Sequence, residues 1–351
     1  MSEKILLISL RINPAFIQHL IAYAKAVQAL GYEAEFLLDP AYSCLPELRQ
    51  AARILQPEEH LEANWRCAIF MNPSLQNLKT ARQLKRFGTR ILYVFHEPWQ
   101  LTWRYIKDEG LKASIVAALA HRFTVPVLQA ADHVLLPSQY ALQVYRAKDA
   151  RHNANASYLP LLYDDDFRGD LPALNSQKKY FSYIGKPCRA HGFDQFLALI
   201  RHAIRTNADI RFLIASRQPA PPALLQDPVL CRSDRVKVQC GRLLSTDEIN
   251  RCYATSVCVW NVYRRSTQSG VLPRALMFGA PTVCSRSGSF LEFVRSGENG
   301  EFVSPDDPVG IIQVYQQFQA RISNYAAQCR LDFTSTFYYK AHLGQVAALL
   351  A

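Results

Sequence analysis

The chain has 351 residues, 49% of them hydrophobic, and a formal net charge of +11 at pH 7. This length exceeds what one hydrophobic core usually organises, so two domains are expected, and the basic balance favours an anionic partner. Since no stretch approaches the roughly 18 uninterrupted apolar residues of a membrane span, a membrane-spanning protein is excluded.

The first half of the chain alternates short apolar runs with helical patterns, which is typical of a parallel sheet with crossover helices. The N-terminal run MSEKILLIS, broken soon after by Arg11, is interpreted as a strand and not as a signal peptide. Residues 1–160 are predicted to form a Rossmann-like domain. Its strands are expected at 4–9, 33–38, 67–71, 90–95 and 133–137, and its helices at 14–30 and 109–131.

Residues 161–178 hold prolines and the acidic run Asp164–Asp166 with little apolar sequence, and they are interpreted as a linker. A second alternation follows, which predicts another Rossmann-like domain over 179–331 and a last helix within 332–351. The strands of the second domain are expected at 180–185, 211–216, 236–241, 256–262 and 281–285. Its helices are expected at 192–206, 246–255, 269–279, 289–296 and 307–331.

Charge and cysteine content bear on the kind of partner and on the compartment. Residues 1–177 carry 19 Lys and Arg against 17 Asp and Glu, whereas residues 178–351 carry 21 against 12. The basic residues of the second half are dispersed, so a folded anion pocket is favoured over a nucleic-acid-binding tail, with simple solubility as the alternative. The nine cysteines include no CxxC pair, which favours a reducing cytoplasm over a disulfide framework or a zinc knuckle.

Two segments of the second half carry a resemblance to a known family. GKPCRAHGFD, residues 185–194, follows the first strand of the predicted second domain, and RRSTQSGVLPRALMFGAPTV, residues 264–283, follows a later strand. With them the chain resembles GT-B glycosyltransferases, most closely the retaining family 4 and its members for bacterial surface polysaccharides. The resemblance implies two Rossmann-like α/β domains facing a cleft. It places the acceptor on the first, a nucleotide sugar on the second, and a last helix that crosses back to the first.

The first segment resembles the part of the family that holds the donor diphosphate with an arginine and a lysine. Lys186 and His191 stand at those positions, with Arg189 between them. A departing nucleoside diphosphate gains negative charge, which fixed cations and a helix N-terminus stabilise. The resemblance therefore implies Lys186 and Arg189 as catalytic residues, and Gly185 and His191 as donor-binding residues. The alternative is a plain helix start with solvent-facing cations.

The second segment resembles the donor-sugar and ribose site of the family, but Ser266 and Arg274 stand where two glutamates are usual. A strand-to-helix junction remains, whose polar side chains and free backbone N–H groups suit a sugar or a phosphate. Gln268 is expected to stand in for the missing acids. A shell without activity, or a donor site rebuilt elsewhere, is the alternative. The donor-binding residues implied here are Arg265, Ser266, Thr267, Gln268, Ser269, Gly270, Val271 and Arg274.

The resemblance also implies positions for the base, for the donor sugar and for the acceptor. VFHEPW, residues 94–99, ends a predicted strand of the first domain, and His96 stands where the family contacts the donor sugar, so the resemblance implies His96 as a third catalytic residue. A buried structural histidine is the alternative. Glu97, Arg11 and Asn13 are expected on the acceptor side. The residues implied for base binding are Gly241, Arg242 and Leu243.

The expected activity is transfer, with retention, of a hexosyl or deoxyhexosyl unit from a nucleoside-diphosphate sugar to a hydroxyl of a saccharide or lipid-linked acceptor in the cytoplasm. Because no carboxylate nucleophile is evident, front-face attack with the leaving phosphate as base is expected. No metal-ligand cluster is evident either, so neither a metal nor another cofactor is expected. The alternatives are a sugar-nucleotide epimerase and a non-catalytic GT-B-like or basic anion- or nucleic-acid-binding protein; no nucleic-acid partner is expected.

Contact with the inner face of a membrane is a further expectation. Helix 109–131 is rich in apolar residues and carries Lys112, His121 and Arg122, and segment 79–90 is strongly basic. Such a surface suits anionic lipid. A solvated helix face is the alternative.

Overall fold

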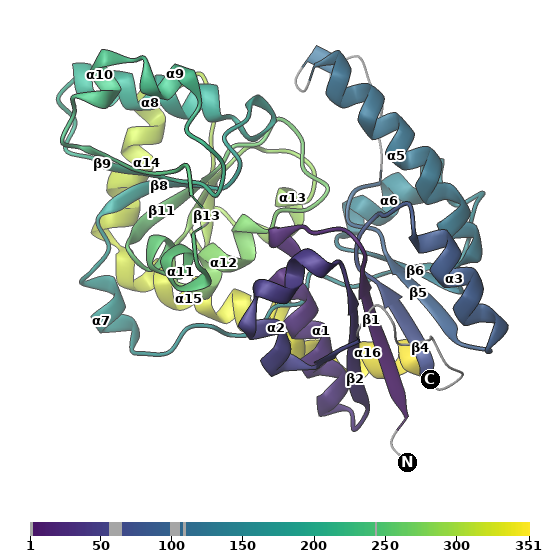
Figure 1. The fold of residues 1–351 in the computed structure, drawn as a ribbon. Helices are drawn as coiled ribbons and strands as arrows, with labels where there is room; N and C mark the ends of the chain where they lie inside the picture. Colours follow the sequence, from purple (N-terminus) through teal and green to yellow (C-terminus); the bar gives the residue numbers. More distant parts are fainter. Residues whose placement is uncertain (1–2, 56–64, 99–105, 108–109, 243) are drawn as a thin grey trace. The chain divides into compact units, whose positions relative to one another are not determined.

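The computed structural model describes residues 3–55, 65–98, 106–107, 110–242 and 244–351. The chain divides into two compact units, and each contains one parallel sheet (Figure 1). Unit 1 comprises Met1–Asp164 and Thr336–Ala351, and unit 2 comprises Asp165–Ser335. The last residues of the chain thus belong to the same unit as the first.

The sheet of unit 1 has the strand order β3-β2-β1-β4-β5-β6-β7, and all its neighbours are parallel. The order reverses between β1 and β4, so the loops that follow these two strands diverge at the carboxyl edge, where open α/β sheets bind ligands. The strands are β1 (Lys4–Ser9), β2 (Glu33–Leu38), β3 (Arg53–Ile54), β4 (Trp65–Phe70), β5 (Arg90–Val94), β6 (His133–Leu136) and β7 (Ala156–Tyr158).

Strand β1 shows how the sheet of unit 1 builds a core on each face. Ile5 and Leu7 pack with α1 and α16, whereas Leu6 and Ile8 face the core that includes Leu84 of α3. This alternation is the period of two that a strand imposes. The helices are α1 (Ile17–Ala29), α2 (Pro46–Ala51), α3 (Asn77–Arg86), α5 (Leu111–Ala130), α6 (Gln139–Lys148) and α16 (Leu343–Leu350).

The sheet of unit 2 has the strand order β10-β9-β8-β11-β12-β13, again parallel throughout. Here the order reverses between β8 and β11. The strands are β8 (Tyr180–Ile184), β9 (Arg211–Ala215), β10 (Val236–Gln239), β11 (Ser256–Asn261), β12 (Thr282–Cys284) and β13 (Gly300–Phe302).

Helices cover both faces of this second sheet. Phe181 of β8 stacks near Phe196 of α8 and Tyr315 of α14 on one face, and α11 packs against β8, β9 and β11 on the other. The helices are α7 (Leu171–Asn175), α8 (Phe193–Arg205), α9 (Pro222–Leu225), α10 (Pro228–Cys231), α11 (Thr246–Ala254), α12 (Val271–Met277), α13 (Phe290–Phe293), α14 (Pro308–Ala320) and α15 (Ile322–Thr336).

Three expected helices differ from the structure. The helix expected at 307–331 is two helices, α14 and α15, and the rings of Phe318 and Tyr325 lie 4.7 Å apart across the break at Arg321. Residues seven apart in one straight helix are separated by about 10 Å along its axis, so the close rings fit a change of direction. The helix expected at 289–296 is only the single turn of α13. The helix expected near the C-terminus is a 3₁₀ turn, Tyr339–His342, followed by α16.

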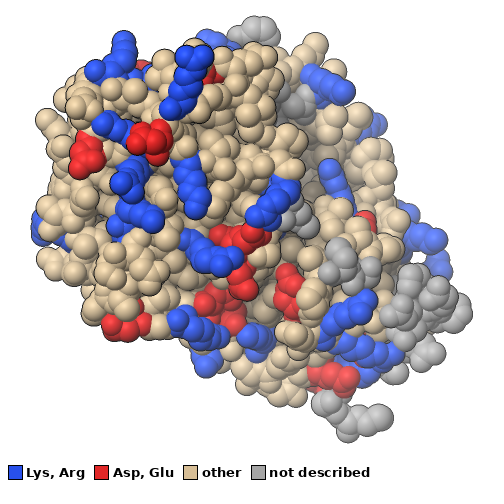
Figure 2. Space-filling view, turned by 60° about the vertical axis from the view of Figure 1, so that its left-hand side comes forward, with Lys and Arg blue, Asp and Glu red and all other residues tan. Residues whose placement is uncertain are grey.

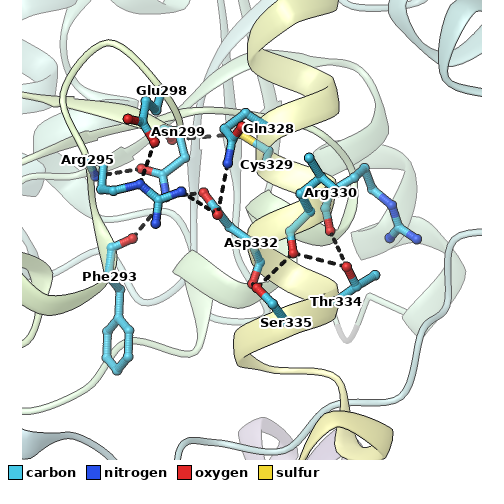
Figure 3. Close-up of polar contacts among 11 residues, drawn as sticks. Phe293, Arg295, Glu298, Asn299, Gln328, Cys329, Arg330, Asp332, Thr334 and Ser335 are labelled. Carbon is cyan, nitrogen blue, oxygen red and sulfur yellow. Dashed lines mark hydrogen bonds and ion pairs between the residues drawn. The ribbon is translucent and has the colours of Figure 1, made fainter.

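A buried carboxylate fixes α15 against the loop before β13 (Figure 3). Asp332 is 7% exposed and accepts hydrogen bonds from Asn299 Nδ2 at 2.7 Å, from Arg295 at 2.6 Å and from Gln328 at 3.1 Å. Asn299 also donates to the carbonyl of Phe293. Because a buried charge is tolerated only when paired and hydrogen-bonded, this network holds the end of unit 2 together.

Candidate functional site

The candidate site of unit 2 lies at the carboxyl edge of its sheet, where β8 and β11 diverge. Two loops meet there, residues 185–192 after β8 (loop A) and residues 262–270 after β11 (loop B). A Cβ added to Gly185 would lie 3.7 Å from Val271 Cγ2, and the backbone N–H of Arg264 donates to Ala190 O at 2.9 Å. The structure therefore brings the two sequence-predicted donor segments together.

Loop A presents two cationic side chains. Lys186 and Arg189 are both exposed. Arg189 Nε lies 3.8 Å from Asp194 Oδ2, a carboxylate that Arg264 holds more closely, at 2.8 Å. Lys186 forms no ion pair with any residue that the structure describes, so its charge is available to an anion.

Glycine is required where loop A passes under loop B. Gly192 has a φ of +67°, and a Cβ added there would lie 2.3 Å from Val262 O. Helix α8 begins directly after it, at Phe193. The glycine thus combines a left-handed backbone with a close approach of two chains, which no larger residue permits without displacement.

His191 of loop A is not a second cation. Its ring stacks on Tyr263 with centroids 4.2 Å apart. Burial lowers the pKa of His191 to about 4; a backbone hydrogen bond at Lys186 opposes this shift, while the charges of Lys186 and Arg265 add to it. The imidazole is therefore neutral at pH 7, and the lysine position of the family carries no charge here.

Much of loop B holds itself together. Ser266 is 5% exposed; its hydroxyl lies 3.0 Å from Ser289 Oγ and donates to Gln268 O, and its carbonyl accepts from the backbone N–H of Ser289. A Cβ added to Gly288 would lie 1.9 Å from that carbonyl. Ser269 Oγ donates to Asn261 Oδ1 and accepts from Leu272 N in the first turn of α12.

Two polar atoms of loop B and its strand have no partner among the described residues. Gln268 Oε1 is buried without a hydrogen-bond donor, and Asn261 Nδ2, on a side chain that is 0% exposed, has no acceptor. An unpaired buried polar atom costs about 1–3 kcal/mol, so such atoms mark places where a ligand or water completes the bonding. Asn261 was not among the residues expected from the sequence, because within SVCVWN it is indistinguishable from a strand end.

The other expected donor residues lie in different surroundings. Arg274 donates to Asn250 Oδ1, lies 3.8 Å from Asp166 Oδ2 and packs over the Tyr253 ring, so its charge is engaged in a cluster between α11, α12 and the chain before α7. Thr267 and Arg265 are half-buried.

The segment expected to contact the base contributes a helix cap. The guanidinium of Arg242 pairs with the Glu248 carboxylate, which also accepts from Ser245 N in a capping box at the start of α11. Gly241 is exposed, with a φ of +89°. Leu243 lies outside the described residues.

In unit 1 the expected residues lie at the carboxyl edge of the first sheet. His96 is 6% exposed and its ring lies 4.3 Å from that of Phe16. Burial, helped by the nearby His19, holds the pKa of His96 well below its usual range, although the backbone of Met71 opposes this shift. Neither ring nitrogen makes a well-formed hydrogen bond to a described residue. The histidine is therefore neutral at pH 7 and is oriented by packing.

The acceptor-side candidates surround this edge. Arg11 and Glu97 are exposed, and the carbonyl of Arg11 accepts from Asn72 Nδ2 at 2.6 Å. The backbone N–H of Asn13 donates to Tyr42 Oη at 2.9 Å, which fixes the loop after β1.

Charge does not distinguish the two units once the structure defines their limits. Unit 1 carries 19 Lys and Arg against 14 Asp and Glu, and unit 2 carries 21 against 15. The asymmetry between the halves of the sequence disappears because Asp165, Asp166 and Asp170 belong to unit 2, where Asp165 pairs with Arg330. Figure 2 shows Lys and Arg scattered among uncharged residues on one face, with acidic residues between them. Both units are net basic, so net charge by itself does not assign the anion pocket to the second unit.

Among the described residues, no three His, Cys, Asp or Glu side chains are grouped as they are around a metal ion. The described helices include none with the length and hydropathy needed to cross a bilayer.

A family model of known proteins matches the second unit. Residues 178–319 match the family model for glycosyl transferases group 1. None of the curated proteins matches the chain by sequence. The matched segment contains every strand of the second sheet and both loops of the candidate site.

Solved structures resemble the chain over its whole length. HepE from Anabaena, solved with UDP and glucose, has 15% identity and a TM-score of 0.69, with 99% of each chain covered. Sucrose-phosphate synthase from Thermosynechococcus elongatus has 15% identity and a TM-score of 0.73, covering 99% of this chain and 98% of that one. TarM has 8% identity and a TM-score of 0.70, covering 100% and 99%. The expected GT-B fold of two Rossmann-like domains is confirmed.

Proposed function

We propose that the chain is a glycosyltransferase that moves a sugar from a nucleoside-diphosphate donor to a hydroxyl group of a saccharide or lipid-linked acceptor, with retention of anomeric configuration. The observation that carries the proposal is the meeting of loops A and B at the switch point of the second sheet. That place combines Lys186, a cation that forms no ion pair with a described residue, with two buried polar atoms, on Gln268 and Asn261, that have no partner among the described residues. The match to glycosyl transferases group 1 spans both loops.

The residues of loop A fit the leaving group. As the bond between the sugar and the diphosphate breaks, charge grows on the diphosphate oxygens, and Lys186 and Arg189 stabilise it. Helix α8 begins at Phe193, directly after loop A, and its N-terminus adds a partial positive charge. In the proposed front-face reaction a leaving oxygen takes the proton of the attacking hydroxyl, so no protein carboxylate is required as nucleophile.

The residues of loop B fit hydroxyl groups rather than charge. Gln268 Oε1 accepts and Asn261 Nδ2 donates, which is the pairing that a ribose or hexose hydroxyl offers in return. HepE was solved with UDP and glucose, and Arabidopsis starch synthase IV with ADP and acarbose. We therefore place the donor hydroxyls at Gln268 and Asn261. The resemblance to transferases for bacterial surface polysaccharides supports the further proposal that the product is such a polymer.

Isothermal titration of the full chain with UDP, ADP and GDP tests the binding step, with a single-stranded oligonucleotide as control. Saturable binding of one diphosphate that Lys186→Ala weakens supports the proposal. Binding of the oligonucleotide alone supports a basic nucleic-acid-binding protein instead. Binding of a diphosphate without hydrolysis of any nucleotide sugar in a donor panel supports a non-catalytic relative.

We also propose that α5 lies on an anionic membrane surface. One face of the helix exposes five large apolar side chains and two cations, and its first turns extend beyond the rest of unit 1 (Figure 1). Spacing at one helical face and basic flanks are typical of helices that bind the lipid headgroup boundary. The apolar residues are Leu111, Ile115, Val116, Leu119 and Phe123, and the cations are Lys112 and Arg122.

One residue expected on this surface, His121, does not lie on it. His121 faces inward, where its Nε2 lies 3.3 Å from Asp149 Oδ1. The neighbouring helix α3 exposes Lys79, Arg82, Lys85 and Arg86, of which Lys85 pairs with Asp132.

Flotation with vesicles that contain or lack an anionic lipid tests this contact. Flotation that requires the anionic lipid and is lost in Leu119→Glu supports it, with Leu331→Glu, an exposed apolar residue of α15, as the matched control. Equal flotation of both variants with either vesicle contradicts it.

A further inference from the structure

A polar pocket lies in unit 2, away from the meeting point of loops A and B. Its volume is about 330 Å³, and it opens between the edge strand β10 and helix α11. Lys179 and Tyr180, at the start of β8, line one end. Since β8 runs on for four more residues to Ile184, about 13 Å of strand separates this end from the edge where loop A begins.

The register of the sheet explains why a pocket forms here. Lys237 of β10 pairs with Leu213 of β9, which pairs with Ser182 of β8, so these side chains share the face on which Tyr180 stands. Helix α11 covers that face over β8, β9 and β11. Lys237 remains exposed. The pocket is the space beside α11 over the edge strand.

Three cations converge on this pocket from three different elements. Lys179 precedes β8, Lys237 lies on β10 and Arg251 lies on α11. The ammonium groups of Lys179 and Lys237 lie 5.4 Å and 6.0 Å from the centre of the Tyr180 ring. None of the three cations forms a salt bridge with a residue that the structure describes.

The one acid of the lining does not neutralise them. Glu248 is bound by the Arg242 guanidinium, which, together with backbone hydrogen bonding at Ser245, lowers its pKa to about 2. Its charge is therefore matched outside the pocket. Gln239 and Thr255 supply neutral polar groups, and the Gln239 oxygen is occupied by the thiol of Cys252 at 3.1 Å, which leaves the Gln239 amide N–H groups for a ligand.

A lysine on an edge strand has a simpler explanation, because it prevents pairing with another sheet. That explanation accounts for Lys237 alone. Lys179 and Arg251 do not lie on the edge strand, yet they line the same hollow. All three cations are exposed and none forms a salt bridge with a described residue, so an anion that enters the hollow can be bound by the three charges together.

We propose that this pocket binds the phosphate monoester of a small hydroxylated molecule, of the sugar-phosphate class. The phosphate dianion lies among Lys179, Lys237 and Arg251. The hydroxylated part lies over the Tyr180 ring, within reach of Gln239 and Thr255. A volume of about 330 Å³ is at the small end of ligand sites, which suits a single monosaccharide phosphate. The site is separate from the proposed donor site and does not depend on it.

Titration of the full chain with a hexose 6-phosphate tests the proposal, with the free hexose and inorganic phosphate as the other two probes. We expect saturable binding of the hexose phosphate, weaker binding of inorganic phosphate and none of the hexose. Lys237→Ala and Arg251→Ala each weaken binding by roughly tenfold or more, as expected for the loss of a charge-assisted contact. Arg205→Ala, an exposed cation at the end of α8, leaves it unchanged.

Two further results would overturn the proposal. If inorganic phosphate binds as tightly as the hexose phosphate, the pocket recognises charge alone. If Lys237→Ala and Arg251→Ala bind as the parent does, the ligand lies elsewhere. Lys186→Ala distinguishes this site from the donor site, because it weakens binding of a nucleoside diphosphate and leaves binding of the hexose phosphate intact.

Discussion

Loops A and B lie at the same edge of the same sheet, yet their polar side chains are used in opposite ways. Loop A leaves Lys186 and Arg189 exposed, whereas Ala190 is buried and the ring of His191 is half-buried and neutral. Loop B buries Ser266 and Ser269 in hydrogen bonds that hold the loop itself. Of the loop B side chains, Gln268 keeps a buried acceptor that has no partner among the residues that the structure describes.

This difference shows that a polar residue in a binding motif is not thereby a binding residue. A serine hydroxyl that already has a donor and an acceptor partner has little to offer a ligand. Loop A is therefore expected to act through charge, and loop B through shape and one amide. Variants of the two loops distinguish these roles, because a binding residue affects turnover and a residue that holds a loop together affects stability.

The largest expected effect is on the packing of loop B. In Gly288→Ala the new Cβ would lie 1.9 Å from Ser266 O, at a φ of +56° that already disfavours alanine. We expect the free energy of unfolding to fall by about 3 kcal/mol or more. Urea denaturation measures it. Gly297→Ala, with a φ of +81° and open space around it, is the matched control and should lose only about 1 kcal/mol.

Replacing either cation of loop A is predicted to lower the turnover of the protein without lowering its stability. Lys186→Ala and Arg189→Ala should each lower kcat by roughly tenfold to a thousandfold, because each removes a cation from the developing charge of the leaving group. Their unfolding free energies should change by less than about 0.5 kcal/mol, as for exposed positions. Normal turnover in both variants would mean that the diphosphate binds elsewhere.

Gln268 lies in loop B, but its replacement is predicted to have the effect expected for the loop A cations, a loss of turnover with little loss of stability. Gln268→Ala should lower donor turnover by at least roughly tenfold while stability stays within about 1 kcal/mol. Ser266→Ala is its counterpart, since loss of the bond to Ser289 should cost about 1 kcal/mol of stability and little turnover. If the two variants show the reverse pattern, the division of roles in loop B is wrong.

The smallest expected effect is the pH dependence that His191 gives to folding. The unfolded chain takes up a proton on this residue near pH 6.5, whereas the folded chain does so only near pH 4. Stability is therefore lost as pH falls from 6.5 to 4, by about 1 kcal/mol after allowance for partial exposure. In His191→Gln this part of the loss should be absent. Unfolding curves at several pH values, with His202→Gln as control, measure the difference.

The sequence predicted the sheets better than it predicted the ends of helices. Strands such as 4–9 and 33–38 agree with β1 and β2 to the residue because buried apolar runs end sharply at polar ones. The short edge strands β3 and β7 carry no such run and were not expected. The helix expected at 307–331 has continuous helical periodicity, and its break at Arg321 is decided by packing between Phe318 and Tyr325.

For the site, residue types and spacing located the loops but not the use of each side chain. Ser266 and Arg274 were expected in the donor site by their place in the motif. Their partners, Ser289 and Asp166, lie far away in the sequence, so no local pattern reveals these bonds. The difference in net charge between the two halves of the sequence does not carry over to the two units, because the comparison divided the chain at residue 177 and the fold divides it at residues 164 and 335.

The path of the chain through the two units has a consequence for its synthesis on the ribosome. Val346 and Leu350 of α16 belong to the same core as Ile5 and Leu7, and Arg66 donates to the carbonyl of Leu350. All of unit 2 lies between them in the chain. At roughly 5–20 residues per second, the ribosome needs on the order of ten seconds or more to make unit 2 before α16 emerges. During that interval the α16 side of the first core is uncovered, so nascent unit 1 is the stage that a chaperone would protect, while unit 2 folds from one uninterrupted segment.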